Sequence, residues 1–118
     1  MILVVDDQES MCWILSKVLS EAGFSVKTAG TAKEALSIAT NNEISATVID
    51  YRLPDKNGFD LFLELRNRNP KIQGVLITSY GSKELREKAL QLGFNAYFDK
   101  PFQNQALTAA LQAGLKNS

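Results

Sequence analysis

Five polar side chains of this sequence stand at the ends of short apolar runs, and together they have the chemistry for phosphoryl transfer. They are Asp6, Asp7, Asp50, Thr78 and Lys100. A carboxylate can attack phosphorus to form an acyl phosphate when a metal ion screens the charges and other groups hold the phosphoryl oxygens. In such a reaction Asp50 is the candidate nucleophile, Thr78 the hydroxyl donor and Lys100 the second positive charge.

The elements that must position these residues are short strands that alternate with amphipathic helices. The β-type runs cover residues 2–5, 24–28, 46–49, 75–78 and 96–98. Five segments of helical period lie between and after them. The first of these places apolar residues on one stripe, namely Met11, Ile14, Leu15, Val18, Leu19 and Ala22.

Particular residues mark where the helices begin and end. Gly23 and Gly93 each follow a helical segment, at a position where a left-handed residue without Cβ strain is favoured. Residues 31–34 read as a capping box that opens the second helix. Pro70 lies just past the third helix, which cannot continue through it.

The strict alternation of strand and helix predicts a parallel sheet covered by helices on both faces, because right-handed crossovers place them there. We therefore expect a doubly wound (βα)5 α/β fold, a flavodoxin-like three-layer sandwich with five parallel strands in the order 2-1-3-4-5. No linker or extra repeat remains outside the five units, so residues 1–118 are predicted to form one domain. Ligands of such sheets sit beyond the carboxyl ends of the strands.

This strand order brings the acidic residues Asp6, Asp7 and Asp50 into one pocket, with Thr78 and Lys100 on its far rim. Two like charges about 4 Å apart cost on the order of 4 kcal/mol at an effective dielectric constant of 20, so the cluster needs a cation. Carboxylate oxygens, without histidine or cysteine ligands, favour Mg²⁺ over Zn²⁺. The sequence thus predicts a magnesium site beside the candidate nucleophile.

Each of these residues also has an ordinary structural interpretation when it is considered alone. Asp7 can cap the first helix, and Asp50 can be a turn residue after a strand. Thr78 can be a plain strand residue and Lys100 a solvated surface lysine. The functional interpretation depends on the fact that four of five strand ends carry compatible groups.

Composition narrows the classes of protein further. The chain has 118 residues, 45% of them hydrophobic, which suffices for one core without disulfides. Thirteen basic and thirteen acidic residues give no net charge that would favour nucleic acid or a membrane surface. The single cysteine, Cys12, fits a reducing compartment, and the opening apolar run is too short for a signal peptide or a membrane span. We expect a cytoplasmic protein.

Four segments of the sequence resemble the receiver domain of two-component response regulators, and the resemblance covers the full length. They are ILVVDD at 2–7, DYRLPDKNG at 50–58, LIT at 76–78 and YFDKPF at 97–102. The spacing of Asp50, Thr78, Tyr97 and Lys100, with Trp13 in the first helix, is most similar to nitrogen-regulation-type regulators that act with σ54.

The resemblance implies a set of ligands and a phosphoryl donor. Asp7, Asp50 and the backbone carbonyl of Arg52 would bind Mg²⁺ directly, and Asp6 would act mainly through water. Asp50 would receive its phosphoryl group from a phosphohistidine of a partner, a sensor histidine kinase or a phosphotransfer protein. The peptide bond between Lys100 and Pro101 would be cis.

The resemblance also implies a conformational switch. Thr78 would move toward the phosphoryl group and Tyr97 would turn inward, which changes the surface of the fourth helix, fifth strand and fifth helix. That surface would control an output domain or partner, with transcription as the expected output, or support a homodimer. Tyr97 can alternatively be a strand aromatic packed on its neighbours.

Three bulky residues near the pocket suggest further roles. Arg52 and Tyr80 each lie two positions after a site residue, and we hypothesise that they restrict water and slow the loss of phosphate. Both can equally be solvated loop residues without a kinetic role. Trp13 lies off the apolar stripe of its helix, so part of its indole is expected to face outward, where a kinase or phosphotransfer helix could dock. Partial burial of the indole against the neighbouring loop is an equal alternative.

Two rival functions belong to other classes. One is a small Mg²⁺-dependent phosphohydrolase that uses an aspartyl-phosphate, but the Asp-x-Asp signature of a large family of that kind is missing. The other is an interaction module that has lost phosphorylation, which the intact Asp7, Asp50, Thr78 and Lys100 disfavour. Because the first strand starts at residue 2 and the chain ends after the fifth helix, we expect a fragment of a larger regulator.

Overall fold

The computed structural model describes residues 1–116 and contains one parallel sheet. Its strands are β1 (Ile2–Val5), β2 (Val26–Ala29), β3 (Ala46–Asp50), β4 (Gln73–Thr78) and β5 (Ala96–Asp99). They lie side by side in the order β2-β1-β3-β4-β5, all parallel. The predicted topology is therefore confirmed.

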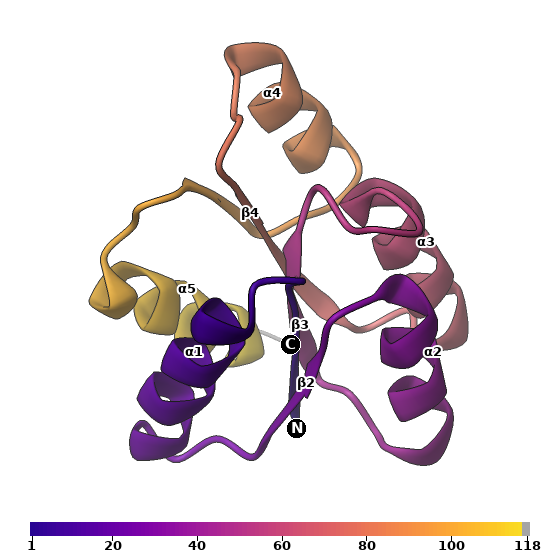
Figure 1. Cartoon of the computed structure of the whole chain (residues 1–118), viewed down its shortest axis with the longest axis vertical. Coiled ribbons are helices and arrows are strands. Elements are labelled where there is room, and N and C mark those ends of the chain that lie inside the picture. Colours follow the sequence, from indigo (N-terminus) through magenta and orange to yellow (C-terminus); the bar gives the residue numbers. More distant parts are fainter. Residues whose placement is uncertain (117–118) are drawn as a thin grey trace.

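Helices cover both faces of this sheet. They are α1 (Glu9–Glu21), α2 (Ala32–Asn41), α3 (Gly58–Arg68), α4 (Lys83–Gln91) and α5 (Asn104–Lys116). Figure 1 shows α1 and α5 together on one side, α2 and α3 on the other, and α4 standing beyond the end of β4. Within the described residues no helix is long and apolar enough to cross a membrane.

Strands β1 and β3 are buried along their whole length, as expected of parallel strands covered by helices on both faces. Alternate residues of β1 point to opposite layers, because successive side chains of a strand alternate. Leu3 and Val5 pack in the core under α2 and α3, whereas Ile2 and Val4 pack in the core under α1 and α5. This burial fixes the register of β1 and hence the level at which its acidic end emerges.

Most of the predicted helix ends are found. Gly23 and Gly93 have positive φ angles of 97° and 102°, as expected of residues that close a helix. The Thr31 hydroxyl accepts a hydrogen bond from the Glu34 N–H at 3.0 Å. Helix α3 ends at Arg68, before Pro70.

Some details of the sequence interpretation were wrong, among them the start of β4, which lies at Gln73 rather than at residue 75. Strand β2 begins at Val26 rather than at residue 24, because the Phe24 N–H closes helix α1 by bonding to the Leu19 carbonyl. The apolar stripe of α1 is also narrower than predicted, since Ile14 is 39% exposed and Ala22 is exposed. Leu15 and Leu19 alone are fully buried in this helix.

Candidate functional site

The register of the sheet brings the three predicted acidic residues together. Strands β1 and β3 pair with Val5 beside Ile49, so Asp6 and Asp50 follow at the same edge. One carboxylate oxygen from each of Asp6, Asp7 and Asp50 lies within 4.8 Å of the others. Asp6 and Asp50 are buried and Asp7 is exposed, so the cluster opens to solvent on the Asp7 side.

Asp6 has both carboxylate oxygens occupied by protein donors. Its Oδ1 accepts the Gln8 N–H at 2.9 Å, and its Oδ2 accepts Lys100 Nζ at 2.7 Å. The structure does not support Asp7 as the cap of α1, because the N-cap position is Gln8. Asp7 therefore does not cap the helix, and it lies at the solvent-exposed side of the cluster.

Asp50, the candidate nucleophile, lies between two donors. Its Oδ2 accepts Lys100 Nζ at 3.1 Å, and its Oδ1 accepts the Arg52 N–H at 3.2 Å. Burial raises the pKa of Asp50 and the neighbouring charge of Asp6 raises it further, while the hydrogen bond from Lys100 acts in the opposite direction. A cation next to Asp50 would therefore stabilise its ionised form and lower its pKa.

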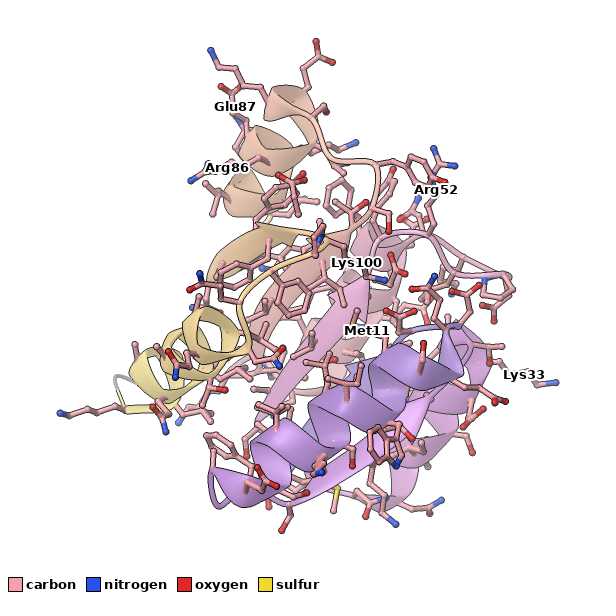
Figure 2. The ribbon with its side chains drawn as sticks, turned by 60° about the vertical axis from the view of Figure 1, so that its left-hand side comes forward. Met11, Lys33, Arg52, Arg86, Glu87 and Lys100 are labelled. Carbon is pink, nitrogen blue, oxygen red and sulfur yellow. The ribbon has the colours of Figure 1, made fainter. Side chains whose placement is uncertain are left out.

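Lys100 lies at the centre of the site, and not on the far rim as the sequence suggested. Its ammonium group donates to Asp6, to Asp50 and, at 3.2 Å, to Gln8 Oε1. Burial alone would lower the pKa of Lys100, but its hydrogen bonds to the two carboxylates outweigh burial and raise it. The peptide bond that follows, Lys100–Pro101, is cis as the resemblance implied. Figure 2 shows Lys100 over the strand ends.

A cavity of about 260 Å³ lies over these groups. Its lining includes Asp7, Gln8, Asp50, Arg52, Thr78, Ser79, Tyr80 and Lys100. Thr78 is fully buried, and its hydroxyl oxygen accepts the Tyr80 N–H at 3.1 Å. Because the oxygen is the acceptor in this bond, the hydroxyl proton of Thr78 can still be donated to another acceptor.

Arg52 and Tyr80 form a stack at the mouth of the cavity. The guanidinium carbon of Arg52 lies 4.6 Å from the ring centroid of Tyr80, a cation–π distance. Tyr80 is 71% exposed, and Figure 2 shows Arg52 on the outer side of the loop that follows β3. The stack joins the loops after β3 and β4 above the candidate nucleophile.

Tyr97 lies in β5 and makes a hydrogen bond to a residue that the sequence analysis did not single out. Its hydroxyl donates to Asp99 Oδ1 at 2.8 Å. Burial, followed by this hydrogen bond and the charge of Asp99, raises the pKa of Tyr97 to about 12. A Cβ atom on Gly81 would collide with both polar groups of the pair, so the backbone of the loop after β4 packs directly on it.

The donor set fits a hard divalent cation. Three carboxylates and one ammonium group leave two negative charges at the cluster, which a divalent ion would balance. The oxygen ligands suit Mg²⁺. The only thiol of the chain donates from Cys12 to the Asp6 carbonyl oxygen at 3.2 Å, and burial raises its pKa, so no thiolate competes for the ion.

Comparison with known protein families identifies the family to which this chain belongs. A family model described as the response regulator receiver domain matches residues 2–112. The chain belongs to this family. The family resemblance and the fold class predicted from the sequence are thereby confirmed. The acidic cluster, Thr78 and Lys100 lie at the strand ends of a receiver domain.

Curated relatives of this receiver domain include regulators of transcription. The transcriptional regulatory protein CusR of Escherichia coli K12 is 34% identical over 115 residues, which are 98% of this chain and 51% of CusR. The photosynthetic apparatus regulatory protein RegA of Cereibacter sphaeroides is 35% identical over 112 residues, 95% of this chain and 61% of RegA. The chain thus spans about half the length of such relatives.

Solved structures agree with this assignment. The receiver domain of NtrX from Brucella abortus superposes with a TM-score of 0.92 at 27% identity over the whole of both chains. A CheY-like receiver domain protein from Methanospirillum hungatei gives 0.91 at 28% identity, over 98% of this chain and 93% of that one. A likeness to NtrX accords with the predicted similarity to nitrogen-regulation-type regulators, and action with σ54 stays a prediction.

A second hollow adjoins the acidic cluster of the receiver domain. It has a volume of about 470 Å³, lies between α1 and the end of β2, and includes Asp6, Asp7 and Trp13 in its lining. Trp13 is 66% exposed, so its indole faces outward as the helical pattern predicted. The expectation that a partner helix docks there stays a prediction.

Sequence reasoning missed three hydrogen-bonding residues in the loops and strands around the site. Gln8 binds Lys100, Asp99 binds Tyr97, and Asp55 binds the start of helix α2. A signal existed only for Asp55, which lies in the Pro-Asp-Lys-Asn-Gly stretch after β3 where turn-forming residues accumulate. The other two contacts depend on side-chain placements that no spacing rule reveals.

Proposed function

We propose that this receiver domain is a cytoplasmic switch that accepts a phosphoryl group on Asp50 from a phosphohistidine of a sensor histidine kinase or phosphotransfer protein. An Asp50 oxygen would form the new bond to phosphorus as the bond to the histidine nitrogen breaks. The observation that carries this proposal is the contact of Asp50 with Lys100 inside the three-carboxylate cluster. Each group there has a task in phosphoryl transfer.

The ligands proposed for Mg²⁺ are Asp7, Asp50 and the backbone carbonyl of Arg52, with Asp6 acting through water. When bound, the ion would screen the negative charges of the nucleophile and the incoming phosphoryl group. Asp6 is suited to the indirect role because its side chain is closed to solvent, whereas the side chain of Asp50 is 10% exposed. Lys100 would bind a phosphoryl oxygen from its present position, because its ammonium group already lies 3.1 Å from Asp50 Oδ2.

The switch would run from Thr78 to the loop after β4 and then to Tyr97. In the present structure the Thr78 hydroxyl accepts a hydrogen bond from the Tyr80 N–H. This bond would break when the hydroxyl turns toward a phosphoryl oxygen. The next residue of that loop, Gly81, packs on the hydroxyl of Tyr97, so the loop and this ring move together. The surface of α4, β5 and α5 would change as a result.

New hydrogen bonds to the phosphoryl group would supply a large part of the free energy for such a population shift. Moving a two-state equilibrium from 1:99 to 99:1 takes about 5.5 kcal/mol. Hydrogen bonds to charged groups contribute about 1.5–3 kcal/mol each, and Thr78 and Lys100 would each form one with the phosphoryl group. These two bonds therefore supply much of the required difference.

The changed surface would act on an output domain or partner. Because the relatives are transcriptional regulators of about twice this length, we propose an output domain that regulates transcription. The zero net charge of the chain does not favour nucleic-acid binding by this domain itself. A homodimer through α4, β5 and α5 is an alternative use of the same surface.

Incubation with acetyl phosphate and Mg²⁺, followed by intact mass measurement, tests the proposed function. We expect a gain of one phosphoryl group that is lost in Asp50→Asn and in the presence of a chelator. Rapid turnover of many phosphate esters would instead support the phosphohydrolase. An unmodified protein would support the interaction module that does not use phosphorylation.

We further propose that the Arg52–Tyr80 stack slows hydrolysis of the phosphorylated form, because it covers the mouth of the cavity through which water must approach. The double variant Arg52→Ala with Tyr80→Ala should lose its phosphoryl group faster than the wild type. Tyr80→Phe keeps the ring and serves as the control, with a lifetime close to that of the wild type. An unchanged lifetime in the double variant would refute the role.

A further inference from the structure

The loop between β3 and α3 is bonded to a different helix through Asp55. Asp55 Oδ1 accepts the Ala32 N–H at 2.9 Å, and Oδ2 accepts the Lys33 N–H at 3.0 Å. Both donors are the first N–H groups of helix α2, where a negative charge is favoured. These two hydrogen bonds lower the pKa of Asp55, so it stays ionised.

The cap of helix α2 is therefore shared between two distant parts of the chain. Asp55 accepts from Ala32 and Lys33, and the Thr31 hydroxyl accepts from Glu34 at 3.0 Å. The next N–H group, from Ala35, bonds to the Thr31 carbonyl and begins the regular helix ladder. Thr31 lies next to the helix in sequence, whereas Asp55 comes from the loop that carries Arg52.

That loop is fixed at its base as well as at its tip. At the base, the Tyr51 N–H bonds to the Ile77 carbonyl at 2.9 Å and the Gly58 N–H bonds to the Tyr51 carbonyl at 2.7 Å. Arg52 also pairs with Asn57 across the loop as an isolated β-bridge. Asp55 adds an attachment to α2 at the far end, so the backbone around Arg52 is held from both ends.

We propose that Asp55 is a positioning residue for the metal site: by tying the loop to α2, it fixes the direction of the Arg52 carbonyl. This inference rests on the proposed function, in which that carbonyl binds Mg²⁺. Asp55 touches no proposed ligand, and it acts through the backbone of its own loop. Helix α2 thereby becomes a support of the site although it contributes no ligand.

Two variants separate positioning from simple helix capping. Asp55→Ala removes the tie and part of the cap, while Thr31→Ala removes the other part of the cap and leaves the tie. Both should lower thermal stability, but only Asp55→Ala should weaken Mg²⁺ binding, by about 10-fold, as is found for residues that support metal ligands. The dissociation constant for Mg²⁺ is measured by isothermal titration calorimetry on the unphosphorylated chain.

Asp55→Asn provides a rescue, because its amide oxygen can still accept one N–H and should recover part of the affinity. Far-UV circular dichroism establishes that each variant is folded before titration. If the wild type binds Mg²⁺ and Asp55→Ala binds it equally well, or if Thr31→Ala weakens binding as much, the positioning role is refuted. Failure of the wild type to bind Mg²⁺ would refute the proposed function itself.

Discussion

Helices α3 and α4 precede and follow strand β4 in the sequence, but they differ greatly in how many residues they bury. Helix α3 buries five residues, Gly58, Phe59, Leu61, Phe62 and Leu65, whereas α4 buries Ala89 alone. Strand β3 is buried throughout, while β5 has no fully buried residue. Figure 1 shows α4 apart from the other helices.

This difference in burial is what the proposed switch requires, namely a firmly packed site next to a more weakly packed surface. Regions with few buried apolar contacts open or shift at low free-energy cost. Asp50, the proposed nucleophile, is the last residue of the buried strand β3, whereas the α4 and β5 region, which is proposed to repack, has few buried residues. Lys100 joins the two regions, since it follows β5 and bonds to Asp6 and Asp50.

The largest expected effect is on stability in the α3 region. Phe62 is fully buried and its ring centroid lies 4.1 Å from that of Phe94. Phe62→Ala should lower the free energy of unfolding by about 3–5 kcal/mol. Leu90→Ala in α4 is the matched control, because Leu90 is 48% exposed, and it should change stability by less than about 0.5 kcal/mol. Urea unfolding measures both variants, and an equal loss of unfolding free energy in the two would contradict the difference between α3 and α4.

A smaller loss is expected when the link between the two regions is cut. Lys100→Ala leaves the buried carboxylates of Asp6 and Asp50 without their cation and should cost about 1–3 kcal/mol in metal-free buffer. Added Mg²⁺ should restore part of this stability, because an ion that binds only the folded state stabilises it. Thermal unfolding with and without Mg²⁺ measures both effects, and a variant as stable as the wild type without metal would contradict them.

The third prediction concerns Tyr97 and Asp99. Because the folded-state pKa of Tyr97 is raised to about 12, its stabilising contribution is complete below about pH 10 and is lost as the pH rises toward 12. Asp99→Asn removes a negative charge next to the phenolate and should shift this titration downward. Ultraviolet absorbance of the phenolate, with Tyr97→Phe as the reference, measures the shift, and an unmoved midpoint would exclude the pairing.

Much of this arrangement followed from the sequence because the strands are short and their ends are polar. Once the order 2-1-3-4-5 is expected, the meeting of Asp6, Asp7 and Asp50 is a consequence of parallel register. The bonds of Lys100 were not predictable, since a long side chain reaches several acceptors from one backbone position. The tie from Asp55 to α2 was missed for a similar reason, because it joins segments more than 20 residues apart.

The boundary of β2 was missed because two local preferences compete at Phe24. Its aromatic side chain favours a strand, but its N–H closes helix α1 by bonding to the Leu19 carbonyl, just after the left-handed residue Gly23. The exposure of Ile14 has a comparable cause, since α1 lies against the sheet along a narrow line of contact through Leu15 and Leu19. Helical periodicity gives the apolar side of a helix but not the width of its contact.

The most direct test of the switch compares hydrogen–deuterium exchange in the wild type and in Asp50→Asn, both treated with acetyl phosphate and Mg²⁺. Peptides that cover α4 and β5 should differ between the two proteins, while peptides from the buried part of α3 should exchange alike. Equal exchange in α4 and β5, despite complete phosphorylation of the wild type, would contradict the account.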